Sequence, residues 1–225
     1  MLALLYDIHG NLPALEAVLV DAERAGARRF LLGGDYALFG AWPAETVERL
    51  RDLDAEWIRG NGERWTASPE EAPDEVQDAI EICRDLLGEA TVEELGALPG
   101  AMTRDGVLYC HGSPLSDVRS FLPDPSDDED ELLNLAAERR IVFGHTHLQF
   151  RRTSAGGAQL INPGSVGVPC DGNHRAAYAL VADDGGVELR RAGYDYRESA
   201  AAVRQRMGEA GEVAARRIEQ ARFDV

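Results

Sequence analysis

The sequence predicts an α/β fold, and three observations support that class. Apolar runs of strand length recur along the chain, each bounded by glycine or polar residues. Amphipathic segments with helix-capping residues separate several of these runs. The chain has 225 residues, of which 44% are hydrophobic, and this is enough for a layered domain with a substantial core.

The apolar runs predict strands, and five of them are followed closely by a residue that can bind a metal ion. Those five runs cover residues 2–6, 29–32, 56–59, 107–110 and 140–143. Later runs predict three further strands, two of them joined as a hairpin, over residues 158–162, 176–181 and 187–191. Because ligands bind at the carboxyl ends of strands in open α/β sheets, we expect the functional site there.

Capping and stop signals mark the helical segments between the strands. Asn11 can cap a helix that begins at Leu12, with Pro13 tolerated in its first turn. The segment 91–94 fits a capping box for a short helix that ends before Pro99. The other predicted helices cover residues 43–53, 69–87, 130–139 and 198–221.

The charge and the cysteine content limit the partners and the environment of the protein. A formal net charge of −17 disfavours bulk nucleic acid and anionic membranes, but it allows a small phosphorylated substrate because bound metal ions would dominate the local field. Three widely spaced cysteines predict reduced thiols. No apolar run has the length of a membrane span, and the first residues lack the pattern of a signal peptide. We therefore expect a soluble cytoplasmic protein, and a homo-oligomer is compatible with the sequence.

Four of the five histidines fall in three short clusters, each of which follows an apolar run. These clusters contain Asp7 and His9, then His111, then His145 and His147. Side chains two residues apart at the end of a strand point the same way, so one ion can bind both members of a pair. Imidazole nitrogens and carboxylate oxygens together suit divalent transition metals.

The clusters belong to an ordered series of five motifs that resembles the calcineurin-like metallophosphoesterase superfamily, in particular its small prokaryotic phosphodiesterase branch. The motifs stand here as Asp7-Ile8-His9, Gly34-Asp35, Gly60-Asn61-Gly62-Glu63, His111-Gly112 and Gly144-His145-Thr146-His147. With the later segments 162–167 and 171–172, the resemblance spans residues 1–196. It implies a four-layer α-β-β-α sandwich of two mixed sheets, with the metal site at the carboxyl ends of the strands. Residues 197–225 would form a C-terminal helical extension packed on the same domain.

The resemblance also implies a centre of two divalent metal ions. One ion would be bound by Asp7, His9, Asp35 and His147, and the other by Asp35, Asn61, His111 and His145, with Asp35 as the bridge. Manganese is the expected metal, and iron, zinc, nickel or cobalt also suit these ligands. Two such ions about 3.5–4 Å apart would acidify a bridging water. The resulting hydroxide, positioned by Asp35, Asn61 and His111, would attack a phosphoryl group.

One residue departs from the family pattern. Many members have a histidine after the motif asparagine, where this chain has Gly62, so the acid that would protonate the leaving group is not identified. Glu63 is the nearest titratable neighbour, although the family uses this acidic position structurally. Four other residues are candidate substrate contacts: Asn11, Arg64, His174 and Arg175.

The motifs favour a phosphodiesterase, and related activities remain open. A diadenosine polyphosphate hydrolase or a phosphoprotein phosphatase would use the same chemistry with a different pocket. A non-catalytic scaffold of the same fold, like the retromer subunit that binds partner proteins, belongs to another functional class. The ligand set argues against a scaffold, because all four motif histidines and both motif aspartates are present.

Overall fold

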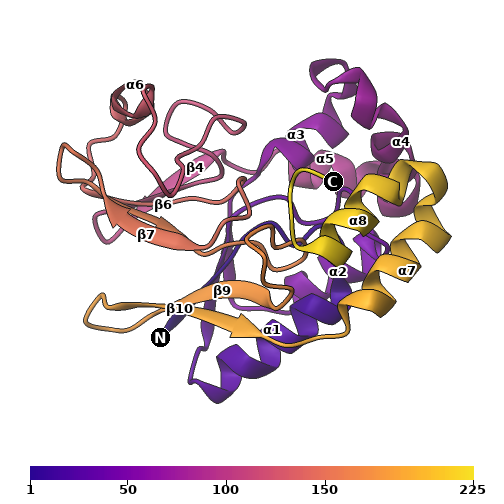
Figure 1. Cartoon of the computed structure of the whole chain (residues 1–225), viewed down its shortest axis with the longest axis horizontal. Coiled ribbons are helices and arrows are strands. Elements are labelled where there is room, and N and C mark those ends of the chain that lie inside the picture. The colour runs from indigo at the N-terminus through magenta and orange to yellow at the C-terminus, as the bar shows by residue number, and fades with distance from the viewer.

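The computed structural model describes all 225 residues and contains two mixed five-stranded sheets (Figure 1). The first has the order β10-β9-β1-β2-β3 and consists of β1 (Leu2–Leu5), β2 (Arg29–Leu32), β3 (Ala55–Trp57), β9 (Ala176–Val181) and β10 (Val187–Ala192). The second has the order β4-β5-β6-β8-β7 and consists of β4 (Ala101–Arg104), β5 (Val107–Cys110), β6 (Arg140–Val142), β7 (Phe150–Thr153) and β8 (Gln159–Asn162). In each sheet the three neighbouring strands that carry most of the motifs are parallel, namely β1-β2-β3 and β5-β6-β8.

Helices cover the outer faces of both sheets. The helices are α1 (Leu12–Arg24), α2 (Pro43–Arg51), α3 (Asn61–Ala67), α4 (Gln77–Leu87), α5 (Glu89–Gly96), α6 (Glu129–Leu133), α7 (Tyr196–Met207) and α8 (Glu212–Gln220). Buried side chains of α1, α2, α4, α7 and α8 share one core with the first sheet, whereas α6 packs on the second sheet (Figure 1). This arrangement confirms the predicted four-layer α/β sandwich. No helix is both long and apolar enough to cross a bilayer.

The two sheets pack face to face, and the alternation of side chains along β1 shows how. Ala3 and Leu5 belong to the core beneath the helices, while Leu2 and Leu4 belong to the core between the sheets. Val142 of β6 contributes to the same inner core from the opposite sheet. Because both faces of β1 are buried, the strand is a continuous apolar run, as is typical of the middle of a parallel sheet.

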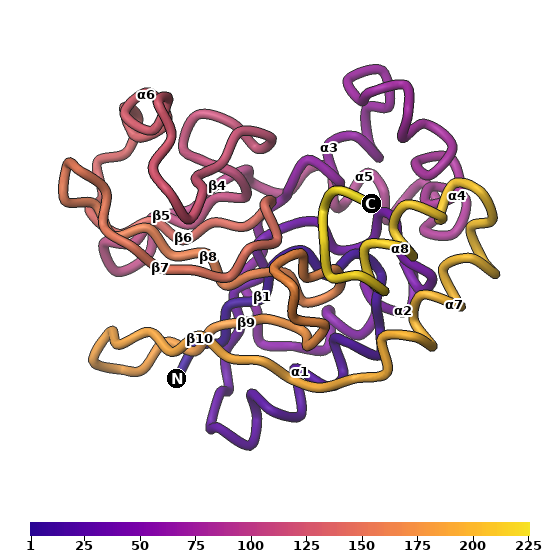
Figure 2. Tube along the Cα trace, viewed as in Figure 1, coloured from indigo at the N-terminus to yellow at the C-terminus, as the bar shows by residue number.

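This packing brings the carboxyl ends of parallel strands from both sheets together. The segments after β1, β2, β3, β5 and β6 carry all the predicted metal ligands: Asp7, Asp35, Asn61, His111, His145 and His147, with His9 two residues after Asp7. The loop after β8 runs beside the loop after β1 near the middle of the molecule (Figure 2), where Gly167 donates its N–H to the Asp7 carbonyl at 3.0 Å.

Several predicted helices are shorter or more broken in the structure. The segment 69–87 forms two 3-10 turns (Pro69–Glu71 and Asp74–Val76) before α4, because Pro73 has no N–H for a helical hydrogen bond. The segment 198–221 divides into α7, a 3-10 turn (Gly208–Gly211) and α8, since Gly208 adopts a φ of +58°.

Two other helix boundaries were wrong. The helix expected over 130–139 covers only Glu129–Leu133 and ends directly before Asn134. The helix expected from Thr91 begins two residues earlier, after Gly88, so Thr91 lies inside α5 and is not its cap.

Two strands, β4 and β7, were not predicted. Both lie at the edges of the second sheet, and in each strand exposed residues alternate with half-buried ones. An edge strand with partly polar side chains lacks the continuous apolar run that identifies a buried strand.

Candidate metal centre

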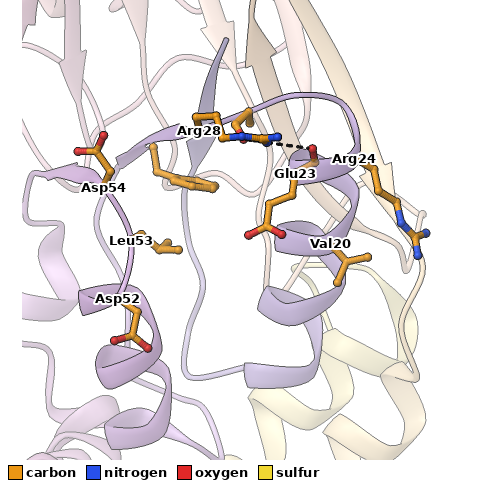
Figure 3. Close-up of a pocket in the computed structure, with 9 residues that line it drawn as sticks. Val20, Glu23, Arg24, Arg28, Asp52, Leu53 and Asp54 are labelled. Atoms are coloured by element: carbon orange, nitrogen blue, oxygen red, sulfur yellow. Dashed lines mark hydrogen bonds between the residues drawn. The ribbon is translucent and has the colours of Figure 1, made fainter.

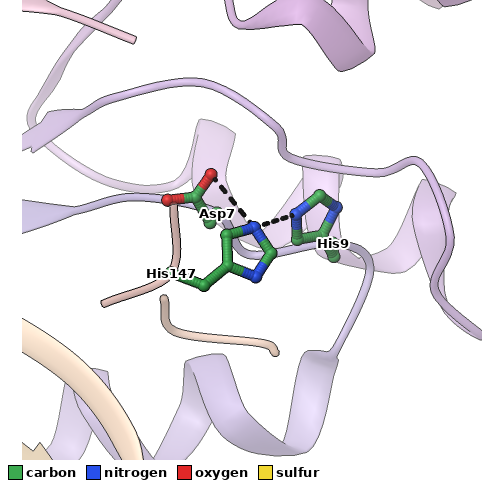
Figure 4. A group of neighbouring side chains, drawn as sticks. All are labelled: Asp7, His9 and His147. Carbon is green, nitrogen blue, oxygen red and sulfur yellow. Dashed lines mark hydrogen bonds and ion pairs between the residues drawn. The ribbon is translucent and has the colours of Figure 1, made fainter. Parts of the chain in front are cut away.

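Two groups of buried side chains at the strand ends have the composition of metal sites. The first contains Asp7, His9 and His147, and the second contains Asp7, Asp35 and His111; within each group the potential ligand atoms lie within 4.8 Å of one another. In the first group, Nε2 of His147 is 3.1 Å from Nε2 of His9 and 3.5 Å from Oδ1 of Asp7 (Figure 4). These distances leave room for an ion between the ligand atoms.

Two carboxylates connect the two groups: Asp7 belongs to both, and Asp35 of the second group also reaches His9 of the first. Oδ1 of Asp35 lies 3.5 Å from Nε2 of His111, and its Oδ2 lies 3.7 Å from Nε2 of His9. The two oxygens of one carboxylate are therefore directed toward histidines of different groups, as a ligand shared by two ions requires.

The hydrogen bonds of the histidines show which ring nitrogen is free. Three ligand histidines donate Nδ1–H to a backbone carbonyl at 2.7–2.9 Å: His9 to Leu38, His111 to Gly33 and His147 to Val168. In a neutral ring this leaves a lone pair on Nε2. Nε2 of His111 is buried without any hydrogen-bond partner. Lone pairs that face carboxylates and each other are unfavourable unless a cation lies between them, so this donor set fits divalent metal ions.

The pKa shifts of the buried His111 and Asp35 also indicate that this site requires positive charge. Burial lowers the pKa of His111, but the charges of Asp35 and Asp7 outweigh burial and raise this pKa to about 10. Burial raises the pKa of Asp35, but the neighbouring His111 and His9 outweigh it and lower this pKa. The carboxylates therefore stabilise protonated imidazoles, or metal ions that replace those protons.

Asn61 and His145 complete the set of predicted ligands. Nδ1 of His145 lies 2.9 Å from Oδ1 of Asn61, and the backbone N–H of His145 donates to both carboxylate oxygens of Asp7 at 3.1–3.2 Å. The structure therefore brings all seven predicted ligands together, and the assignment of each to a particular ion stays a prediction.

Most of the ligands have a strained backbone. Five of the seven have a positive φ of 49–68°: Asp7, His9, Asp35, His145 and His147. Non-glycine residues rarely adopt this region, which costs on the order of 1 kcal/mol per residue and persists where the surrounding structure imposes it. Such strain concentrates at functional sites.

Glu63 holds two of the motif loops together. Its buried carboxylate accepts backbone N–H bonds of 2.8 Å from Asp35, Tyr36 and Gly60. Burial and the charge of Asp35 raise its pKa to about 7, although the three N–H donors oppose that shift. Both oxygens are engaged by the backbone, so Glu63 positions Asp35 and the start of α3.

Gly62 lies so close to Asp35 that a larger residue would displace the Asp35 carboxylate. A Cβ atom at this position would be 2.8 Å from Oδ1 of Asp35, to which the N–H of Gly62 donates at 2.7 Å. A histidine here, as in many relatives, would require Asp35 to move. The departure from the family pattern is thus built into the geometry of the centre.

Of the candidate substrate contacts, Arg64 and Asn11 are engaged elsewhere in the structure, and Arg175 is exposed with no side-chain partner. Arg64 forms a two-bond ion pair with Asp117 at 2.6 and 2.7 Å and a third bond to Glu71. Asn11 caps α1 through the N–H of Ala14, as predicted, and its side chain is buried. Arg175 is exposed, and its backbone N–H bonds to the side chain of the nearby residue 173.

The fourth candidate, His174, supports the C-terminal helices. Its ring stacks on Tyr196 with centroids 4.2 Å apart, and its Nε2 bonds to the Glu219 carbonyl at 2.9 Å. None of the four candidates lines the cavity above the metal centre. Their roles in substrate binding stay predictions.

A cavity of about 350 Å³ opens directly onto the metal ligands. Five predicted ligands line it: His9, Asp35, Asn61, His145 and His147. Its remaining walls contain residues that the sequence analysis did not identify, including Phe39, Trp65, Arg217 and Phe223. No local motif marks these residues, because they meet only through the tertiary fold.

A larger hollow of about 570 Å³ lies at the amino ends of β2 and β3, opposite the metal centre (Figure 3). Its lining mixes charged and apolar side chains and includes no histidine or cysteine. Arg28 there donates to the backbone carbonyls of Glu23 and Ala27. This hollow has no set of groups that could bind a metal or perform catalysis.

The fold and the site define a two-sheet α/β protein with two groups of buried candidate metal ligands at facing strand ends. Residues 1–185 match the family described as the calcineurin-like phosphoesterase superfamily domain. The chain therefore belongs to the calcineurin-like phosphoesterase superfamily, which confirms the resemblance inferred from the motifs.

Full-length relatives and structures agree with this assignment. An uncharacterized protein of Methanocaldococcus jannaschii is 30% identical over 224 residues, covering 88% of this chain and 90% of its own. The crystal structure of a metallophosphoesterase from Sphaerobacter thermophilus matches with a TM-score of 0.80, 26% identity and 98% coverage of both chains. A hypothetical protein from Pyrococcus horikoshii OT3 has the same fold, with a TM-score of 0.80, 20% identity and coverage of 94% and 96%. All three are small prokaryotic proteins that share nearly the full length of this chain.

Proposed function

We propose that this protein hydrolyses a phosphodiester or a related phosphate ester with the help of two divalent metal ions, manganese being the first candidate. Membership of the superfamily supports metal-dependent hydrolysis of a phosphate ester. The observation that carries the proposal is the position of Asp35, whose two oxygens are directed toward histidines of different groups. A small phosphorylated substrate is the expected partner.

The residues of this chain set the geometry of the reaction. Bound divalent ions would acidify a water molecule and neutralise charge on the phosphoryl oxygens. Asp35 is held by the N–H of Gly62, and His111 is held by the Gly33 carbonyl, so both keep fixed orientations. The buried location of these groups excludes bulk water and strengthens their electrostatic interactions with a bound phosphate.

The site contains no evident acid for the leaving group. Gly62 stands where many relatives have histidine, and the carboxylate of Glu63 is fully engaged by backbone N–H groups. Esters whose leaving group is stable as an anion need no proton donor. We therefore propose that the enzyme prefers activated esters with acidic leaving groups, such as aryl phosphates.

The cavity favours small substrates over phosphoproteins. Its volume of about 350 Å³ is at the lower end of the range for small-molecule sites. A dinucleoside polyphosphate stays an alternative substrate with the same chemistry. A scaffold role is disfavoured, because a scaffold has no need of buried, strained metal ligands.

An activity screen tests this proposal. Protein loaded with Mn²⁺ should cleave bis(p-nitrophenyl) phosphate faster than p-nitrophenyl phosphate, and a chelator should abolish both activities. The screen should also include cyclic and linear dinucleotides and dinucleoside polyphosphates. Protein that holds two ions per chain and cleaves none of these esters would contradict the proposal.

A further inference from the structure

The end of the chain forms one wall of the cavity above the metal centre. The floor consists of predicted metal ligands, and the opposite side is lined from α8 and the segment after it by Ala214, Val213, Arg217 and Phe223. These residues lie beyond the part of the chain that matches the family, which ends at residue 185. This wall therefore lies outside the part of the chain that the family match covers.

A tight turn directs α8 back along α7. Gly211 lies where a Cβ would be 2.8 Å from both Val203 and Met207, so only glycine permits this close approach. Arg204 of α7 then pairs with Glu212 and Glu219 on α8. Helix α8 therefore runs back beside α7 (Figure 1), and these ion pairs hold the two helices together.

The end of α8 is attached to the loop that follows the metal ligands. The N–H of Gly172 donates to the Ala221 carbonyl at 2.8 Å, and Asp171 forms a β-bridge with Arg222. His174 bonds to the Glu219 carbonyl one turn earlier. These attachments lie between Arg217 and Phe223 in the sequence. They therefore hold both residues in place.

Arg217 has no acidic partner, although the protein has 40 acidic residues and only 23 basic ones. It is the only arginine that lines the cavity, and no carboxylate lies within ion-pair distance. Its Nε donates to the Phe223 carbonyl at 3.1 Å, and its guanidinium carbon lies 3.9 Å from the centre of the Phe223 ring. Nη1 and Nη2 form no hydrogen bond with the protein, so two donor groups remain for an anion.

Three aromatic side chains line the cavity, together with Glu75 and several aliphatic residues. Phe39 lies beside His9 with ring centroids 5.9 Å apart, and Trp65 and Phe223 line the same cavity. Phe223 is 50% exposed, and Val213, which lines the same cavity, is 47% exposed. Large apolar surfaces at the mouth of a polar site suit a planar, apolar group of a ligand.

We propose that α8 and the chain end select the substrate: Arg217 binds an anionic oxygen of the phosphate ester, and the aromatic wall accommodates a planar aromatic ester group. The predicted substrate class is therefore an aromatic or nucleoside-like phosphate ester. This inference rests on the proposed function for the identity of the reaction, but its binding component can be measured without turnover.

Binding of phosphonates, which are not hydrolysed, tests the inference directly. Calorimetry with the Mn²⁺-loaded protein should show that phenylphosphonate binds more tightly than methylphosphonate. Arg217→Gln should weaken both ligands by about tenfold or more, the effect of losing a charge-assisted hydrogen bond. Phe223→Ala should reduce the preference for the phenyl compound by at least about threefold. Arg216→Gln, an exposed arginine on the same helix that pairs with Glu212, is the matched control and should bind both like the unaltered protein.

The outcomes separate the inference from the proposed function. Unchanged phosphonate binding by Arg217→Gln that retains its metal content, or no binding by the unaltered protein, would overturn the inference, even if ester hydrolysis proceeds. Binding that depends on Arg217 in a protein that hydrolyses no ester would support the inference and refute the proposed function. If both hold, Arg217→Gln should raise KM for bis(p-nitrophenyl) phosphate with a smaller change in kcat.

Discussion

At the scale of single residues, the candidate metal centre depends on two carboxylates, Asp7 and Asp35, that each lie near histidines of both groups. Asp35 follows β2 with a φ of +57°, and its two oxygens face His9 and His111. A residue in this strained conformation is stabilised by neighbours: the carboxylate of Glu63 accepts its N–H, and its own Oδ1 accepts the N–H of Gly62. The shared ligand and its supports act as one unit.

Asp35→Ala should reduce kcat/KM by about a thousandfold or more, because the loss of a shared ligand removes several kcal/mol of stabilisation of the transition state. Asp124→Asn, at an exposed position with no hydrogen bond, is the control and should behave like the unaltered enzyme. Steady-state kinetics with bis(p-nitrophenyl) phosphate measure both. Near-normal turnover by folded Asp35→Ala protein would refute a two-ion centre at this position.

Gly62→Ala should lower metal affinity and activity by about tenfold to a hundredfold, as is usual when a neighbour of a metal ligand is disturbed. The added Cβ would lie 2.8 Å from Oδ1 of Asp35 and push that carboxylate out of place. Gly100→Ala is the matched control, since a Cβ there meets nothing within 4 Å. Equal Mn²⁺ affinity of the two variants, measured by calorimetry, would show that Gly62 does not constrain Asp35.

At the scale of elements, the start of α1 joins three parts of the molecule. Oδ1 of Asn11 accepts from the N–H of Ala14 and the hydroxyl of Ser199 on α7, while Nδ2 donates to the Gly167 carbonyl at 2.7 Å. The loop of Gly167 lies against the segment that holds Asp7. The cap of one helix therefore also positions the C-terminal helices and a metal-binding loop.

Asn11→Ala should reduce the free energy of unfolding by about 2–4 kcal/mol, because it removes a helix cap and leaves buried polar groups without partners. Asn134→Ala, at an exposed helix end, should change it by less than about 1 kcal/mol. Urea denaturation of the metal-free proteins measures both values. Equal stability of the two variants would mean that the hydrogen bonds of Asn11 do not stabilise the fold.

The elements that the sequence predicted best are the buried ones. β2, β5 and β9 were predicted with the correct limits, because each consists largely of consecutive apolar residues. The edge strands β4 and β7 were missed, since half-exposed strands have mixed side chains. Two segments were predicted as continuous helices but are broken in the structure. Pro73 and Gly208 interrupt them, although the rest of their composition favours helix.

At the scale of the whole molecule, the sequence predicted the candidate metal ligands. It did not predict the cavity wall that α8 and the segment after it form. Each ligand follows a strand within a short motif, so the topology of the fold brings the ligands together. Arg217 and Phe223 reach the same site only because α8 folds back at Gly211 and is attached to the loop near Asp171. Contacts over such sequence distances leave no local pattern.

The net charge of −17 and the protonated histidines predict that metal binding depends on pH. The pKa of His111 in the metal-free protein is raised to about 10, so its ring carries a proton at pH 8 that an ion must displace. Mn²⁺ binding at pH 8 should therefore release at least about one proton per chain, and affinity should fall as the pH is lowered. The raised pKa of His111 stabilises the metal-free fold, and this stabilisation is fully present below about pH 6.5. It should be lost as the pH rises through about 10.

Calorimetry in two buffers with different ionisation enthalpies measures the released protons. The apparent binding enthalpy should change between the buffers by the difference in their ionisation enthalpies, multiplied by the number of protons. An enthalpy that is the same in both buffers would show that His111 is not protonated before the metal binds.

The most direct test of the two-ion centre is anomalous diffraction from crystals soaked in Mn²⁺. Two peaks about 3.5–4 Å apart should appear on either side of Asp35, one next to Nε2 of His9 and His147 and the other next to Nε2 of His111 and Nδ1 of His145. A single peak, or manganese bound only away from these side chains, would contradict a shared two-ion site.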